Sequence, residues 1–305
     1  MLGHHELRRA GALTCAVAAL LGSLATAGRA EAYCRSTTCT GDCPRDENEC
    51  KTTGQPLYWS SSCVGISLNS SGGAYVPYKY FQQAAEKALL EWSDLPCGGA
   101  DQVASIAFSQ LDDITCDDAE YNDGDKNANG IVFQNTKWVY TSEDNNVAKT
   151  TVTFDADTGE ILDADIEINQ ANNNLTVSDE VIEYDLQSIL THEIGHLIGL
   201  DHSPDSDATM YASYEPGTVD QRSLSPDDME AVCAAYPPSR VAQCAPQPRG
   251  GLAIECLGEG ATDSGGCAVA RAPSPSSSRL GLFLAAVLTA FAMRRPKINK
   301  RGALS

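Results

Sequence analysis

The chain has 305 residues, of which 42% are hydrophobic and 20% charged, a composition typical of one or two globular domains. Its 41 acidic residues outnumber the 21 basic ones, and the formal net charge is −20 at pH 7. Such a charge repels nucleic acid phosphates and anionic membranes, so it argues against partners of those kinds and suits a soluble extracellular protein.

The first 32 residues are typical of a secretory signal. Arg8 and Arg9 precede an apolar stretch over 11–28, and Ala30-Glu31-Ala32 matches an A-x-A cleavage site. We therefore expect the mature chain to begin at Tyr33. The alternative is an uncleaved N-terminal membrane anchor.

Cysteine usage also indicates export. Of twelve cysteines, Cys15 leaves with the signal and Cys267 belongs to the C-terminal tail, which leaves an even number. In an oxidising compartment the remaining ten predict five disulfides of unspecified connectivity. They are Cys34, Cys39, Cys43, Cys50, Cys63, Cys97, Cys116, Cys233, Cys244 and Cys256. The alternative is a zinc site formed by the cluster over 34–50.

Residues 33–55 form a cystine-rich segment that is too short for a core of its own. It could latch onto the domain that follows or be a vestigial prosegment. Beyond it, apolar residues at helical spacing predict a helix over 78–92. Strand patterns follow the ranges 56–68, 104–111, 130–140, 149–154 and 160–169.

An acidic loop raises the question of calcium. Residues 125–130 place oxygen side chains at alternate positions before a glycine, like the first half of a calcium loop, but the twelfth position is Thr136. A plain solvated loop is the preferred interpretation. Asp155, Asp157 and Asp163 are alternative Ca²⁺ ligands with no better support.

The stretch THEIGHLIGLDH contains the metal-binding chemistry. On a helix beginning near Asp185, His192 and His196 lie on one face, four residues apart. Gly199 can end that helix in a left-handed turn, which returns His202 as a third nitrogen ligand. Three protein ligands and one open position predict a catalytic rather than a structural zinc.

The segment from His192 to Tyr214 resembles the metzincin clan of zinc peptidases, and the matrixins in particular. Met210, in ATMY, resembles the clan's Met-turn, and the stretch 224–232 resembles the final matrixin helix. The resemblance implies an α+β fold: a mixed twisted sheet, three main helices, and a zinc cleft between upper and lower subdomains. It also implies that the strand over 160–169 is the sheet edge above the cleft. Tyr214 would then be a substrate-binding pocket-wall residue; the alternative is an ordinary packed tyrosine.

The chain departs from the matrixin pattern in several places. Ala212 replaces the proline usual two residues after the Met-turn methionine, and the propeptide cysteine motif is absent. No histidines are left over for the structural zinc of animal matrixins. The fifth, tyrosine ligand of astacins and serralysins is also missing.

These features predict a monomeric zinc metalloendopeptidase that cleaves proteins or peptides, with its catalytic domain over 56–238. Glu193, beside the ligands, would be the general base that activates water. The alternative is an extracellular adhesion module with a structural zinc. Glu193 counts against that alternative, because a structural site has no use for a water-activating carboxylate.

After residue 238 the composition shifts to a Gly/Pro/Ser-rich linker over 239–266, followed by a tail over 267–305. The tail combines Gly-Gly-Cys267, an apolar run over 280–293 and a basic end. Fourteen apolar residues are fewer than the roughly 20 needed for a spanning helix. This order resembles the bacterial MYXO-CTERM sorting tag, which implies surface anchoring through Cys267. The alternative is a simple C-terminal membrane anchor.

Overall fold

The computed structural model of the protein describes residues 32–99, 102–141, 146–253 and 302–304. Residues 1–31 of the predicted signal, Cys256, Cys267 and the apolar run of the predicted sorting tag lie outside these ranges. Within the described residues, no helix has the length and apolar character needed to cross a membrane.

The fold is organised around a mixed sheet with the strand order β12-β7-β8-β6-β2-β5. Strand β2 pairs in parallel with β5 and β6, and β6 pairs in parallel with β8. Strand β7 is antiparallel to both β8 and β12. The bounds are β2 (Cys63–Leu68), β5 (Ala107–Gln110), β6 (Gly130–Gln134), β7 (Ala148–Phe154), β8 (Ile161–Asn169) and β12 (Gly302–Leu304).

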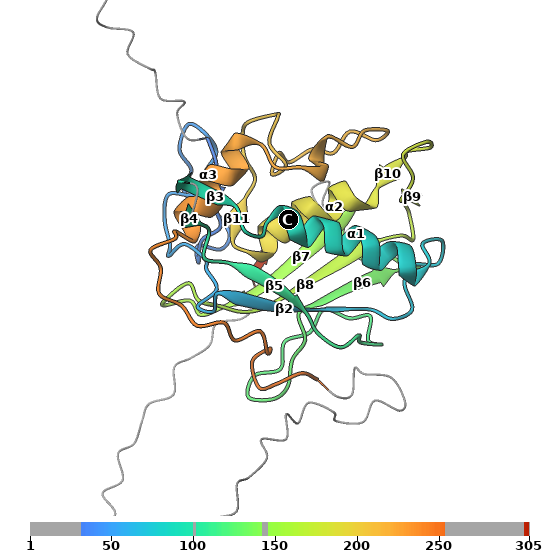
Figure 1. The fold of residues 1–305 in the computed structure, drawn as a ribbon, viewed down its shortest axis with the longest axis horizontal. Helices are drawn as coiled ribbons and strands as arrows, with labels where there is room; N and C mark the ends of the chain where they lie inside the picture. Colours follow the sequence, from blue (N-terminus) through green and yellow to red (C-terminus); the bar gives the residue numbers. More distant parts are fainter. Residues whose placement is uncertain (1–31, 100–101, 142–145, 254–301, 305) are drawn as a thin grey trace, which may run out of the picture. The chain divides into compact units, whose positions relative to one another are not determined.

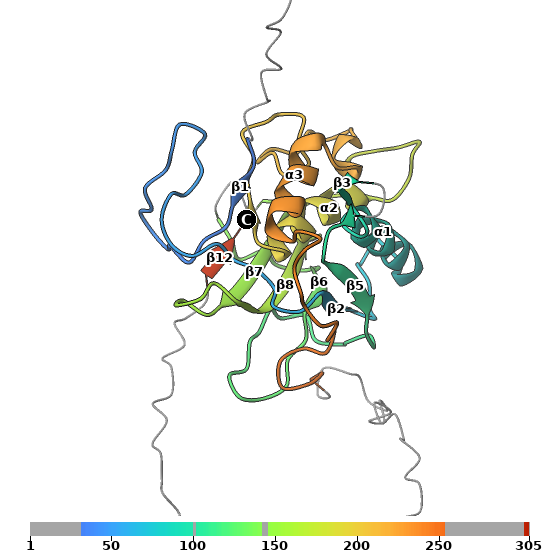
Figure 2. The ribbon, with the colours of Figure 1, turned by 60° about the vertical axis from the view of Figure 1, so that its left-hand side comes forward.

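The expectation that residues 160–169 form the sheet edge is wrong. Strand β8 lies between β6 and β7, and Figure 2 shows β12 on the outer side of β7. All nine residues of β8 are buried. The alternation of polar and apolar residues along β8 therefore separates two buried faces of the strand, and neither face is exposed to solvent. Burial raises the pKa of Asp165, on the polar face, to about 7, although its carboxylate accepts a hydrogen bond from the Gly130 amide.

In the part of the chain that the structure describes, three α-helices accompany the sheet, as expected: α1 (Tyr78–Glu91), α2 (Leu186–Leu197) and α3 (Pro226–Ala235). Helices α1 and α2 lie on the same side of the sheet (Figure 1). Phe81, Ala85 and Ala88 on α1 are fully buried in the core that these two helices share with the sheet. A short 3-10 helix, η2 (Asp220–Arg222), precedes α3.

Short two-stranded sheets join segments that lie outside the main sheet. Strand β1 (Cys34–Arg35) pairs with β11 (Leu200–Asp201), β3 (Pro96–Gly99) with β4 (Gln102–Val103), and β9 (Leu175–Thr176) with β10 (Tyr184–Asp185). The strand expected over 56–68 begins only at Cys63. Before it, Trp59 is buried against the end of α2, where its indole N–H donates to the Leu197 carbonyl at 2.9 Å.

The described cysteines are oxidised. Four disulfides join Cys34 to Cys50, Cys39 to Cys43, Cys63 to Cys244 and Cys97 to Cys233. Cys116 is disulfide-bonded as well. A zinc site in the cluster over 34–50 is therefore wrong, because all four of its thiols are used in disulfides.

Two regions expected to be loosely structured are packed against the domain. The start of the linker is tied down by the Cys63–Cys244 disulfide and by the Ala245 amide, which donates to the Ser61 hydroxyl at 3.0 Å. In the 125–130 loop, Asn127 is 1% exposed, and its side-chain amide donates to the carbonyls of Asp125 and Arg249. The loop is thus a packed turn, and calcium binding stays an untested prediction.

Candidate active site

Helix α2 begins and ends where its sequence predicts. Asp185 is its N-cap, and its carboxylate accepts hydrogen bonds from the Ser188 amide at 2.8 Å and hydroxyl at 2.9 Å. Gly199 ends the helical segment with a φ of +86°. A Cβ at Gly199 would lie 2.5 Å from the Leu57 carbonyl oxygen, so both the turn and its packing require glycine.

The three predicted histidines converge. One nitrogen of each of His192, His196 and His202 lies within 4.8 Å of the others. The Nδ1 of His192 contacts the Thr209 carbonyl at 2.7 Å, and the Nδ1 of His196 contacts the Leu200 carbonyl at 3.0 Å. A carbonyl partner fixes the proton on Nδ1, so each Nε2 is left with a free lone pair.

The donor set fits a zinc ion. The Nε2 atoms of His196 and His202 are 3.2 Å apart. Two nitrogens at 2.0–2.1 Å from a tetrahedral zinc lie roughly 3.3 Å apart. Burial lowers the pKa of all three imidazoles, which favours the neutral, ligating form.

Glu193 is held beside the triad by a residue that the sequence did not single out. Its side chain is only 6% exposed, and burial raises the pKa of its carboxyl group, partly opposed by His192 and Thr150. The Thr150 hydroxyl on β7 donates to the Glu193 Oε2 at 2.5 Å. The strand pattern around Thr150 predicts burial but not this partner, which lies 43 residues further along the chain.

Met210 lies directly beneath the metal-binding helix. It is 2% exposed, and a Cβ added to Gly195 would come within 2.1 Å of its sulfur. Any larger residue at Gly195, between the two helical histidines, would therefore displace the methionine. The buried Met210 side chain thus packs against the helix that carries His192 and His196.

Asp228 connects α3 to this turn. Its buried carboxylate accepts hydrogen bonds from the amides of Thr209 at 2.8 Å, Met210 at 3.0 Å and Ser225 at 2.8 Å. Ser225 and Asp228 form a capping box at the start of α3, a pattern visible in the sequence as Ser-x-x-Asp. Because the Thr209 carbonyl contacts His192, the start of α3 supports the first histidine.

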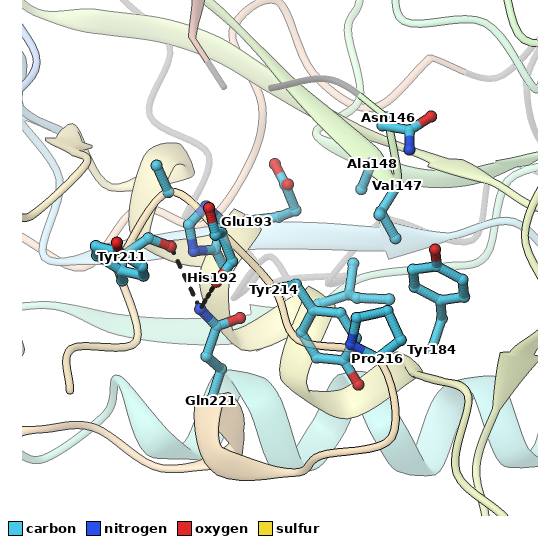
Figure 3. A pocket seen from close by; sticks show the side chains of 13 residues that line it. Asn146, Val147, Ala148, Tyr184, His192, Glu193, Tyr211, Tyr214, Pro216 and Gln221 are labelled. Atoms are coloured by element: carbon cyan, nitrogen blue, oxygen red, sulfur yellow. Dashed lines mark hydrogen bonds between the residues drawn. The ribbon is translucent and has the colours of Figure 1, made fainter. Parts of the chain in front are cut away.

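A pocket of about 400 Å³ opens beside the triad, with His192 and Glu193 in its lining. Figure 3 shows residues Asn146 to Ala148 on one side and the segment from Tyr211 to Pro216 on the other. The Gln221 side-chain amide donates to the carbonyls of Tyr211 and Ser213, both at 3.3 Å, and so shapes the second wall.

Tyr214 lines this pocket and is also fixed in place. Its hydroxyl accepts from the Asp185 amide and donates to the Thr218 carbonyl, both at 2.8 Å. Arg222, which the sequence reasoning missed, pairs with the buried Asp185 carboxylate at 2.9 and 2.6 Å. The pocket wall is thus attached to the start of α2.

An α+β domain that sets a histidine-bearing helix over a buried methionine turn has the architecture of the metzincins. The matrixin family profile matches residues 75–237, more than half of the chain. The protein therefore belongs to the matrixin family, whose members are zinc-dependent metalloendopeptidases.

Individual relatives agree with this assignment. The chain is 32% identical over 156 residues to metalloendoproteinase 1-MMP of Arabidopsis thaliana, a match covering 50% of this chain and 37% of that protein. It is 42% identical over 66 residues to metalloendoproteinase 1 of Glycine max, covering 22% and 21%. It is 44% identical over 59 residues to the interstitial collagenase of Bos taurus, covering 19% and 12%. The chain thus spans well under half the length of these curated relatives.

Proposed function

We propose that the protein is a secreted or surface-anchored zinc metalloendopeptidase, with its catalytic domain over residues 56–238. The observation that carries this proposal is the convergence of three imidazole nitrogens beside a buried glutamate, at a pocket that His192 and Glu193 line. His192, His196 and His202 would hold the zinc. The metal's contribution when bound is Lewis acidity.

Glu193 acts as the general base. Its carboxylate accepts a proton from the attacking water and returns that proton to the amine that leaves when the peptide bond breaks. Burial raises its pKa, which makes the carboxylate a stronger proton acceptor than an exposed one. Thr150, by donating to Oε2, leaves Oε1 to face the water.

The pocket beside the triad receives a substrate side chain. Tyr184, Ile189, Tyr214 and Pro216 give it an aromatic and aliphatic part, and Asn146, Ser213 and Gln221 add polar groups to the lining. Ala148, the first residue of β7, also lines this pocket.

The test compares the mature protein with its Glu193→Ala and Glu180→Ala variants on casein and on a peptide library, each with and without a chelator. We expect the parent and the exposed-site control Glu180→Ala to cleave, and the chelator to stop both. Removal of a general base costs about 10²- to 10⁴-fold in rate. Glu193→Ala should therefore lose activity while keeping about one zinc per chain; full activity in that variant would overturn the role of Glu193.

Export and anchoring rest on the sequence. The disulfides are consistent with an oxidising compartment. We propose removal of the signal before Tyr33 and attachment to the bacterial surface through Cys267, after loss of the chain beyond it. That loss would also remove β12 and leave the outer side of β7 without its partner strand.

A further inference from the structure

The cystine-rich segment over residues 33–55 precedes the part of the chain that the family profile matches. It does not line the pocket beside the histidines. Instead it lies against the turn that links the end of α2 to the third histidine, with β1 paired to β11. In Figure 1 the blue N-terminal segment passes beside β11. The segment therefore contacts the metal-site scaffold without blocking the cleft.

The backbone of this turn takes several of its hydrogen bonds from the segment. The Gly199 carbonyl accepts from the Ser36 amide at 3.0 Å and from the Arg35 guanidinium at 3.3 Å. The Ser36 hydroxyl, fully buried, donates to the Leu200 carbonyl at 2.8 Å. The same Leu200 carbonyl is the partner of His196 Nδ1, so Ser36 and a predicted ligand share one acceptor.

The N-terminal segment is attached to the turn at two places: the first is the contact of β1 and Ser36 with residues 199–201, and the second is the side chain of Asp201. Its Oδ1 accepts from the amide of His202 at 3.0 Å, and its Oδ2 pairs with the Lys51 ammonium at 3.1 Å. Both side chains of this ion pair are largely buried, at 13% and 14% exposed, so the pair is shielded from solvent.

The Cys34–Cys50 disulfide joins the two attachment points. Cys34 is paired with Asp201 in the β1–β11 register, and Cys50 precedes Lys51. The disulfide closes residues 34–50 into one covalent ring that contains the strand, and Lys51 directly follows the last residue of that ring, so neither the strand nor the ammonium group can move far from the turn independently. Such a ring lowers the conformational freedom of what it holds.

We propose that residues 33–55 are a brace that holds the third-histidine turn in its metal-binding conformation, with Ser36 and Lys51 as the positioning residues. This inference rests on the proposed zinc site. A turn that is ordered before the metal arrives loses less entropy on binding and releases the metal more slowly.

Charge and positioning make opposite predictions for Lys51. Replacing Lys51 by methionine removes a positive charge near the site and leaves Asp201 unneutralised, which by Coulomb attraction alone would tighten the binding of a cation. The brace predicts weaker binding for the same change. Ser36→Ala changes no charge and removes one buried hydrogen bond, a loss that corresponds to roughly 2- to 12-fold in an equilibrium constant.

The experiment measures zinc release from the mature protein to a chromogenic chelator, and hydrogen exchange over residues 199–202 in the zinc-free protein. Ser36→Ala and Lys51→Met are compared with the parent and with Lys51→Arg, which can keep the ion pair. Thr52→Ala is the matched control, because the Thr52 hydroxyl donates within the segment, to the Pro44 carbonyl.

We expect Ser36→Ala and Lys51→Met each to release zinc at least about 3-fold faster and to exchange faster over the turn, while Lys51→Arg and Thr52→Ala stay near the parent. Unchanged release and exchange in both variants, or slower release in Lys51→Met, would overturn the brace. A parent that binds no zinc would instead refute the proposed function, and the exchange measurement on the zinc-free protein would still decide whether the segment orders the turn.

Discussion

Replacing Asp228 by asparagine should destabilise the protein out of proportion to the loss of one charge. The Asp228 carboxylate accepts three backbone N–H groups in a site that is 1% exposed. An asparagine keeps one acceptor oxygen, which can serve the amides of Thr209 and Ser225, but its NH₂ group would face the Met210 amide. The buried Met210 N–H then loses its acceptor and faces the N–H groups of the asparagine side chain.

The structure sets the size of the effect. A hydrogen bond to a charged group contributes about 1.5–3 kcal/mol, and a buried unsatisfied amide adds a cost of similar size, so about 3 kcal/mol is expected. For a domain of 150–250 residues this corresponds to a drop of roughly 6–12 °C in the unfolding temperature. Since the Thr209 carbonyl holds His192, zinc binding should weaken as well.

Calorimetry of the parent, Asp228→Asn and Asp207→Asn provides the measurement. Asp207 lies in the same turn and is exposed, so the identical chemical change there should cost less than about 0.5 kcal/mol. A drop below about 2 °C for Asp228→Asn, or one equal to that of the control, would refute the reasoning.

Three further predictions concern the site and the maturation of the chain. Thr150→Val should lower kcat with little change in KM or zinc content, because the hydroxyl that orients Glu193 is lost. Thr150→Ser keeps a hydroxyl and should keep much of the rate, whereas an unchanged kcat in Thr150→Val would contradict this role. Burial lowers the pKa of the three histidines below 6.5, so the neutral, ligating form persists to more acidic pH. When the pH of the zinc-loaded protein is lowered, half of the bound zinc should be released only below pH 6.5. Half-release at or above pH 6.5 would contradict this, because protons would then displace zinc from the histidines more easily than their lowered pKa values allow. Mass spectrometry of surface material should find the chain cut near Cys267, and an intact peptide ending at Ser305 would instead favour direct membrane insertion.

Local sequence patterns predicted the elements that carry the site. The apolar spacing over 78–92 gave α1 almost to the residue, and Asp185 caps α2 as its position before the apolar stripe predicts. Gly199 has the left-handed conformation that the histidine spacing requires. In each case the signal lies within a few residues of the structure that it determines.

Contacts between distant segments were not predictable in this way. Strand alternation shows which residues face the interior but not which neighbour a strand has, and this is why β8 was mistaken for the edge. Thr150, Asp228 and Arg222 act on partners 18 to 43 residues away, and their roles depend on the packing of two elements. The Lys51–Asp201 pair connects the N-terminal segment to β11. Neither residue carries a local pattern that identifies the other.

The long-range disulfides have a consequence for a peptidase exposed to its own activity. The bonds Cys63–Cys244 and Cys97–Cys233 enclose 181 and 136 residues of sequence separation. Self-digestion at a single exposed loop between Cys97 and Cys233 would leave both fragments covalently joined and the cleft assembled. A nicked enzyme of this kind would run as one band on a non-reducing gel, separate only after reduction, and still be able to cleave its substrate.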